Sequence, residues 1–277
     1  MKKILIFLLF IITCQQYVIA NNDIQSPPLS IDKCSDQIPY GMPKSNKNGI
    51  IICRNAYITE NDTKAKLPIW VSYKLTSEHT TGCIKRTNAF AVDNSLPKGS
   101  RAELSDYTKS GYDMGHMAND GDMSYNPLVE HESFILSNMS PQTGTINRIS
   151  FRQLESIIRA WVEQVKHPFL IYVGPLYNSS DKTIGKNKVV VPHGFYKIVI
   201  DMETNEYAAW IFPNEGKVDD LNKIRATITS IEKESNIIFP LPVKSYELPL
   251  NKNWIMPSLG QFTKDKQQVC GVSNENK

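Results

Sequence analysis

A histidine lies at the centre of a polar segment that runs from Gly111 to Met123 and reads Gly-Tyr-Asp-Met-Gly-His-Met-Ala-Asn-Asp-Gly-Asp-Met. His116 can take a proton from water near neutral pH, because an imidazole titrates in that range. Gly115 allows the backbone to turn tightly, and Asp113 can orient the imidazole or brace the loop. Taken alone, this spacing is equally typical of a loop histidine that hydrogen-bonds to a neighbouring carbonyl.

A second polar segment begins at residues 138–142 (Asn-Met-Ser-Pro-Gln) and continues with Asn147, Glu155 and Arg159. At 100° per residue on a helix, Asn147 and Arg159 lie about 120° apart with Glu155 between them. An amide oxygen, a carboxylate and a guanidinium would then share one flank of a rigid element. The alternative is a solvated helix face, on which Glu155 and Arg159 form an i,i+4 pair worth about 0.3 kcal/mol.

The helix that carries these side chains is the clearest element of the sequence. Apolar residues recur at three- and four-residue steps and predict an amphipathic helix over residues 148–166, with an apolar stripe formed by Leu154, Ile157, Ile158, Trp161, Val162 and Val165. His167-Pro168 ends the helix.

Runs of β-branched and aromatic residues predict strands at residues 67–75, 88–92, 169–173, 188–191, 195–201 and 206–212. A second helix is expected at residues 219–234, and residues 93–112 are expected to form a loop. Strands and helices that mix without regular alternation predict one α+β domain over residues 21–277, with residues 21–50 as an extended lead-in.

The two polar segments together resemble the DNA/RNA non-specific endonuclease family, the ββα-metal or His-Me finger nucleases. The family's hallmark is an Asp-Arg-Gly-His box, then Asn-x-x-Pro-Gln, then Asn, then Glu and Arg on a helix. Here the box is residues 113–116, and the later motif is residues 138–142, followed by Asn147, Glu155 and Arg159. The resemblance covers residues 50–245 and implies a mainly antiparallel sheet flanked by helices, with a ββα-metal active-site motif.

The resemblance also implies a role for each matching residue in hydrolysing phosphodiester bonds of DNA and RNA. His116 matches the general base, and Asn147 the single side chain that binds Mg²⁺, for which Mn²⁺ is expected to substitute. Glu155 matches a carboxylate that holds a water of the metal, and Arg159 a group near the phosphate. The remaining matches belong to the polar network around the site and are Asp113, Asn138 and Gln142.

Met114 departs from the family pattern, because the box normally has arginine at this position. The missing charge motivates the first of two alternatives to a full nuclease. The first is a catalytically weak nucleic-acid-binding module on the same scaffold. The second is a phosphodiesterase that acts on small phosphoesters.

Residues 1–20 have the pattern of an export signal, with Lys2 and Lys3, an apolar run from Ile4 to Ile12, and cleavage expected after Ala20. An uncleaved anchor and a lipoprotein site at Cys14 are the alternatives. Loss of the two lysines lowers the formal net charge from +3 to +1. A nearly neutral protein must therefore hold nucleic acid by a local basic patch, through phosphate contacts. The expected location is the periplasm or the external medium.

Four cysteines remain after residue 20, and an even number in an exported chain predicts two disulfides. Three pairings are possible. We favour Cys34 with Cys53, which closes the N-terminal segment, and Cys83 with Cys270, which holds the C-terminal segment. No CxxC spacing indicates a zinc site.

Overall fold

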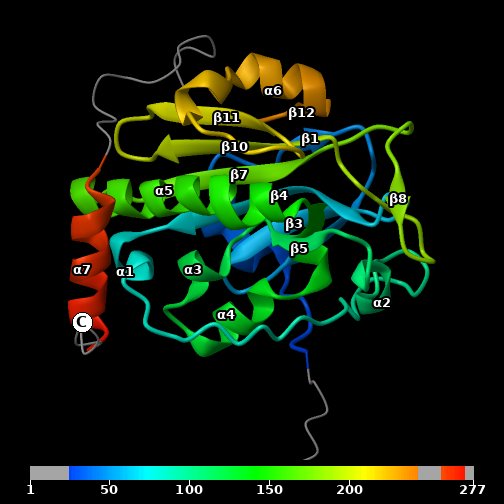
Figure 1. Ribbon diagram of the computed structural model, residues 1–277, viewed down its shortest axis with the longest axis horizontal. Helices are drawn as coiled ribbons and strands as arrows, with labels where there is room; N and C mark the ends of the chain where they lie inside the picture. Colours follow the sequence, from blue (N-terminus) through cyan, green and yellow to red (C-terminus); the bar gives the residue numbers. More distant parts are fainter. Residues whose placement is uncertain (1–24, 243–256, 272–277) are drawn as a thin grey trace, which may run out of the picture.

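A six-stranded sheet forms the middle layer of the protein (Figure 1), in a computed structural model that describes residues 25–242 and 257–271. The strand order is β11-β10-β7-β4-β3-β2, and every neighbouring pair is antiparallel. The strands are β2 (Ile50–Cys53), β3 (Tyr57–Asp62), β4 (Leu67–Leu75), β7 (Phe169–Leu176), β10 (Gly194–Asp201) and β11 (Tyr207–Pro213).

Two helices cover opposite faces of this sheet, and each encloses its own apolar core (Figure 1). Helix α5 (Arg152–Val165) packs on one face, and α6 (Ile228–Ser235) packs on the other. Alternate residues of β10 serve the two cores: Phe195 and Val199 face α5, whereas Tyr196 and Ile198 face α6. Strand β10 therefore contributes side chains to both apolar cores.

Three two-stranded pairs lie outside the central sheet. They are β1 (Lys44–Ser45) with β12 (Ile237–Ile238), β8 (Thr183–Ile184) with β9 (Val189–Val190), and β5 (Asp113–His116) with β6 (Met139–Gln142). The other α-helices are α1 (Ser77–Thr80), α2 (Leu104–Tyr107), α3 (Asp120–Met123), α4 (Pro127–Ser133) and α7 (Leu259–Val269). Short helical turns occur at η1 (Ile31–Gln37), η2 (Leu136–Asn138), η3 (Ile146–Phe151) and η4 (Leu221–Ile224).

The predicted α+β class with a mainly antiparallel sheet is confirmed, and so are its central elements. The strand expected at residues 67–75 has those bounds, and three of the four strands expected after the long helix form β7, β10 and β11. Residues 188–191 keep only the two-residue β9, in a small hairpin apart from the main sheet.

Three local predictions are wrong. Residues 88–92 form no strand beyond a single bridge between Ala91 and Ile135. The helix expected at residues 219–234 is interrupted, because Arg225 is extended and bridges to Trp210, and the next N–H, of Ala226, donates to the Ala209 carbonyl at the sheet edge. The loop at residues 93–112 contains the one-turn helix α2.

The lead-in at residues 21–50 is not simply extended. It contains η1 and β1, and its backbone is held against the sheet by a bridge from Leu29 to Cys53. Arg54 donates from Nη1 to the Ser26 carbonyl, and its Nη2 pairs with buried Asp93 at 2.9 Å. Tertiary contacts thus override the loop-like composition of the segment.

Both favoured disulfides are confirmed. Cys34 pairs with Cys53, and Cys83 pairs with Cys270. The export signal expected at residues 1–20 lies outside the described residues. None of the helices in the described part of the chain has the length and apolarity needed to cross a membrane.

Candidate active site

Strands β5 and β6 and the helical segment after them bring the two polar motifs together. The antiparallel register sets Asp113 opposite Gln142, and Gly115 opposite Ser140. A Cβ atom at Gly115 would lie 2.0 Å from Gln142 Oε1, so glycine leaves the space that the buried Gln142 side chain occupies. The chain then enters η3 and α5, which completes a β–β–α arrangement.

His116 ends β5 in an aromatic, almost fully buried environment. Its ring packs edge-on against Phe134 at 4.7 Å between centroids and lies 5.8 Å from Phe90. Burial lowers the pKa of His116 to about 4, and the nearby charges of Asp120 and Arg86 act on it in opposite directions. The imidazole is therefore neutral at neutral pH, which is the form that accepts a proton.

The Nε2 atom of His116 is buried and has no hydrogen-bond partner among the residues that the structure describes. An unpaired buried polar atom costs about 1–3 kcal/mol of desolvation, so a water or a substrate group that hydrogen-bonds to Nε2 would relieve this cost. Both amide atoms of buried Gln142 are unpaired in the same way.

Asn138 holds the loop that follows His116. Its Oδ1 accepts from the Ala118 N–H at 2.9 Å, and its Nδ2 donates to the carbonyls of Ala118 and Ser133 at 2.8 and 2.7 Å. The side chain is fully buried and is bonded to backbone at both ends. Asn138 therefore acts as a positioning residue for the histidine loop.

Asp113 links β5 to the helical segment. It receives a two-point ion pair from Arg148, and Asn147 Nδ2 donates to its Oδ2 at 3.0 Å. Burial opposes ionisation of Asp113, but the hydrogen bonds from Arg148 and Asn147 outweigh it and lower the carboxyl's pKa. Because the amide NH₂ of Asn147 is held in this way, its oxygen Oδ1 is the atom left to face a ligand.

The first turn of the long helix differs from the prediction. Residues Ile146–Phe151 form a π-helical turn, and α-helix begins only at Arg152. The 100° step therefore fails across the turn that carries Asn147, whereas it holds for Glu155 and Arg159. π-Helical turns are frequent at functional sites because they re-aim one side chain within a rigid helix.

Glu155 and Arg159 form hydrogen bonds with separate partners instead of an i,i+4 pair. Glu155 accepts from Lys197 Nζ at 3.2 Å. Burial raises the pKa of Glu155, and the charge of Lys197 opposes that rise. Arg159 donates from Nη1 to Asp122 Oδ1 at 2.8 Å and to Asn119 Oδ1 at 3.0 Å.

Sequence reasoning missed the groups that hold these two charges. Lys197 is fully buried on β10, and Asp122 on α3 also accepts from Tyr73 Oη at 2.8 Å. A lysine in the apolar run from Phe195 to Ile200 was the available signal, because a buried lysine requires a partner. Asp122 had no comparable signal.

Met114 is partly buried and packs against an apolar cluster that includes Leu136 and Met139. Arg148, which belongs to none of the motifs found in the sequence, carries a largely exposed guanidinium beside Asp113 and Asn147. An arginine is therefore present at this end of the site, although it comes from η3 and not from position 114 of the box.

The fold and the ordered polar motifs define a class of nuclease. A profile of the DNA/RNA non-specific endonuclease family matches residues 35–245, and the chain belongs to this family. It is thus an endonuclease, a hydrolase of a family whose members cleave nucleic acids and depend on a metal.

Individual relatives agree with this assignment. The chain is 30% identical to a nuclease of Syncephalastrum racemosum, over 79% of this chain and 75% of that protein. It is 28% identical to mitochondrial endonuclease G of Homo sapiens, over 72% and 71% of the two chains. Among solved structures it is similar to a chain of the EndoG/EndoGI complex, with a TM-score of 0.68, 26% identity, and coverage of 78% of this chain and 93% of that one.

Proposed function

We propose that the protein is an exported, sugar-nonspecific endonuclease that cleaves DNA and RNA with His116 as general base and Mg²⁺ as cofactor. The observation that carries the proposal is a buried, neutral imidazole whose Nε2 lacks a partner within the described chain, beside a β–β–α unit that presents Asn147. Mn²⁺ is expected to substitute for Mg²⁺.

The donor groups at the site fit a hard cation. Within the described ranges, no group of three or more His, Cys, Asp or Glu side chains could hold a metal ion. A cation here would be held by Asn147 Oδ1, with waters and substrate oxygens as its other ligands, and Mg²⁺ accepts such a set. When bound, it supplies positive charge to the phosphate during attack and departure of the 3′-oxygen.

The chain's own residues then have distinct tasks. His116 takes the proton from the attacking water, and its hydrophobic packing keeps the imidazole neutral until that step. Arg159, fixed by Asp122, presents its guanidinium to the phosphate. Glu155 is placed to hold a water near the phosphate, and Lys197 fixes its orientation.

Substrate contacts are expected to be to phosphate and sugar. The described fold presents no helix-turn-helix or zinc finger that would read bases. Cleavage should therefore show little sequence preference and should weaken steeply with salt. Export to the periplasm or the medium is proposed from the pattern of residues 1–20 and from the two disulfides.

The test is incubation of the protein, from residue 21 onwards, with plasmid, single-stranded DNA and RNA. All three should be cut, activity should disappear in EDTA, and Mg²⁺ or Mn²⁺ should restore it. Full activity in EDTA would contradict the metal assignment. A single preferred cut sequence would contradict the substrate assignment, and binding without cleavage would favour a nucleic-acid-binding module.

Two variants assign the metal ligand. Asn147→Ala should lose activity through the cation, so excess Mn²⁺ should restore part of it. Asn178→Ala, in an exposed loop, is the matched control and should cleave at the wild-type rate. An Asn147→Ala protein with unchanged metal dependence would place the ligand elsewhere.

A further inference from the structure

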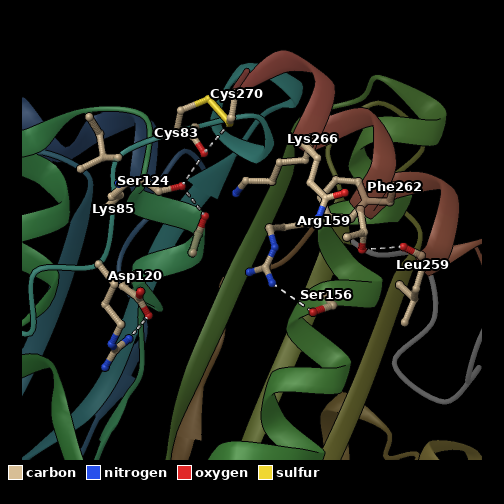
Figure 2. Close-up of a pocket in the computed structure, with 16 residues that line it drawn as sticks. Cys83, Lys85, Asp120, Ser124, Ser156, Arg159, Leu259, Phe262, Lys266 and Cys270 are labelled. Atoms are coloured by element: carbon tan, nitrogen blue, oxygen red, sulfur yellow. Dashed lines mark hydrogen bonds and ion pairs between the residues drawn. A yellow bond between two sulfur atoms is a disulfide. The ribbon is translucent and has the colours of Figure 1, made fainter. Parts of the chain in front are cut away.

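A pocket of about 470 Å³ lies between α7 and α5 on one side and residues 82–86 with α3 on the other. Figure 2 shows Arg159 and Lys266 on the first side, and Lys85, Asp120 and Ser124 on the second. We call this space the α7 pocket.

The α7 pocket is strongly basic. Its lining contains four cationic side chains and one acid, namely Lys85, Arg86, Arg159, Lys266 and Asp120. Arg86 is paired with Asp120, and Arg159 with Asp122. Among the described residues, neither Lys85 nor Lys266 forms an ion pair. The two lysines thus leave uncompensated positive charge in one hollow.

The positive charge of Lys266 is destabilised by its position in the α7 pocket. Its side chain is half-buried in the α7 pocket, and burial lowers the pKa of its ammonium group. The positive charge of Arg159 lowers that pKa further, against weaker attraction from Asp122 and Asp120. An anion beside the Lys266 ammonium group would relieve both effects, because its negative charge offsets the repulsion from Arg159 and replaces the solvation that burial removes.

The α7 pocket adjoins the catalytic residues. Arg159 and Ser156 line it from α5, and Arg159 lies one helical turn from Glu155. Arg86 and Asp120 line its opposite wall, and their charges reach His116. A polyanion bound at the catalytic residues would therefore extend into the adjoining α7 pocket.

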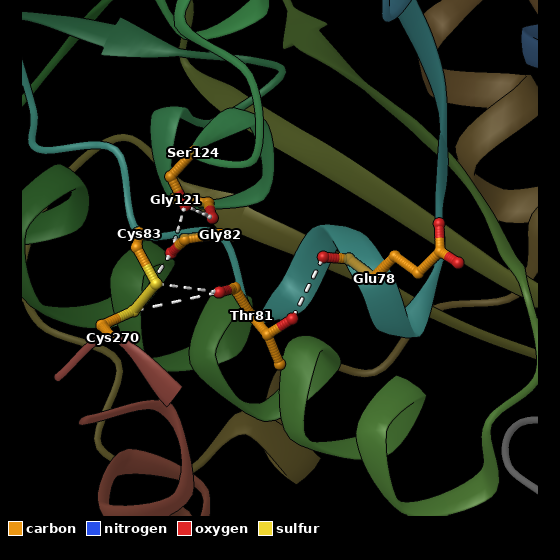
Figure 3. The surroundings of a disulfide bond; sticks show 7 residues. All are labelled: Glu78, Thr81, Gly82, Cys83, Gly121, Ser124 and Cys270. Atoms are coloured by element: carbon orange, nitrogen blue, oxygen red, sulfur yellow. Dashed lines mark hydrogen bonds between the residues drawn. A yellow bond between two sulfur atoms is a disulfide. The ribbon is translucent and has the colours of Figure 1, made fainter. Parts of the chain in front are cut away.

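Helix α7 itself lies outside the residues that match the family, which end at residue 245. It packs against α5, and the Cys83–Cys270 disulfide ties it to the loop that forms the facing wall (Figure 3). The wall that carries Lys266 thus lies outside the residues that match the family, and the disulfide fixes it covalently across the pocket.

We infer that the α7 pocket binds a second phosphate of the nucleic-acid strand, away from the phosphate that is cleaved, with Lys266 as its principal contact. The inference rests on the proposed function and extends it with a substrate-binding subsite. Lys85 supplies a further charge from the opposite wall. The subsite strengthens binding of strands long enough to reach it and leaves the chemical step unchanged.

The experiment measures binding without cleavage. A fluorescent single strand of about 16 nucleotides, which is long enough to span such a groove, is titrated against His116→Ala protein in Mg²⁺. Adding Lys266→Gln should weaken binding about three- to tenfold at low salt. It should also reduce the slope of log K against log[salt] by about 0.7, the value for one lost phosphate contact on a single strand.

Matched variants separate this contact from general charge and from folding. Lys264→Gln removes the same charge from an exposed position of α7 outside the pocket and should bind like its parent. Lys266→Arg should retain affinity. If Lys266→Gln and Lys264→Gln behave alike, or if Lys266→Arg is as weak as Lys266→Gln, the subsite is refuted.

Two further readouts separate the possible sources of failure. With the His116 side chain intact, Lys266→Gln should raise KM for the long strand and leave kcat and the cleavage of a dinucleotide unchanged. Inorganic phosphate should displace the strand no better than chloride at equal ionic strength, and a tight phosphate site would reassign the pocket to the free ion. Wild-type cleavage by His116→Ala would overturn the proposed base, while the binding comparison would still decide the subsite.

Discussion

The two faces of the central sheet bury very different chemistry. On the α6 face, the core is formed mainly by apolar and aromatic side chains such as Trp70, Tyr196, Ile198 and Ile231. The buried Glu60 carboxylate there accepts a hydrogen bond from Trp70 Nε1 instead of pairing with a cation of the described chain. On the α5 face, an equally buried layer contains the Lys197–Glu155 pair among its apolar residues. The same strand β10 supplies both Ile198 and Lys197 to these two environments.

We interpret this difference as a division between residues of the α6 face that stabilise the fold and the charged residues of the α5 face that form the candidate site. Buried ion pairs add little stability over apolar residues of similar size, because desolvation offsets their attraction. We therefore expect the Lys197–Glu155 pair on the α5 face to serve the site more than the stability of the fold. Variants on the two faces should separate activity from stability, and the four predictions below test that separation.

The largest effect is expected at the histidine. His116→Ala should lose about 10²–10⁴-fold in kcat, the usual range for removal of a general base, and excess Mn²⁺ should not restore it. Ile231→Ala on the opposite face should lose about 2–5 kcal/mol of unfolding free energy and keep its activity per folded molecule. Plasmid cleavage and urea unfolding measure the two quantities. A fully active His116→Ala in a clean preparation would place the catalytic base elsewhere.

The second comparison uses neighbouring residues of β10. Lys197→Met leaves Glu155 buried without its partner, which should cost about 3–5 kcal/mol and also lower kcat. Ile198→Ala should cost about 2–5 kcal/mol with kcat unchanged. Denaturant unfolding with single-turnover cleavage distinguishes them. Recovery of stability but not of activity in Lys197→Met/Glu155→Gln would show that the pair serves the site.

The pH dependence of cleavage provides the third test. Burial lowers the pKa of His116 to about 4, so the base is neutral and active above that value and becomes protonated below it. The kcat/KM profile should stay level through pH 6 and fall near pH 4. The unfolded chain takes up this proton near pH 6.5, so the stability linked to His116 is complete above 6.5 and is lost as the pH falls to 4. A loss of activity centred at 6.5 would contradict the buried environment.

The smallest effect is expected at Met114. Met114→Arg restores the family's charge near a negatively charged substrate, and we expect kcat/KM to be preserved or to rise by less than about tenfold. Arg148 already provides an exposed guanidinium at this end of the site, which limits the gain. Steady-state cleavage of an oligonucleotide measures it, and a large fall in kcat/KM would show that the apolar packing of Met114 matters more than its lack of charge.

Sequence alone predicted the elements whose pattern is local. The long helix and β4 have strong periodicity, so their residues identify them without tertiary information. Strands β2 and β3 were not predicted. The segment before β2 is rich in Pro, Asn and Lys and resembles a loop. Helix α7 was also missed, since its apolar stripe is weak and its position depends on Cys270.

The residues of the candidate site also divide into those that a local sequence pattern identifies and those that depend on tertiary contacts. Its chemical groups were predictable, because His116, Asn147, Glu155 and Arg159 keep a recognisable order and spacing. Their supports were not, since Lys197 lies 42 residues from Glu155 and Asp122 lies 37 from Arg159, and no local pattern links such pairs. The π-helical turn at Asn147 was equally hidden, because the sequence has the same apolar period as a regular helix.

The Cys83–Cys270 disulfide also affects when the molecule becomes complete. Its cysteines are 187 residues apart, so the bond can form only after nearly the whole catalytic unit has been synthesised. In a chain-entropy estimate, closing so long a loop contributes about 5 kcal/mol by restricting the unfolded chain. While the thiols remain reduced, the wall that carries Lys266 is not covalently fastened to the facing loop. Completion of the pocket thus depends on oxidation of these two cysteines.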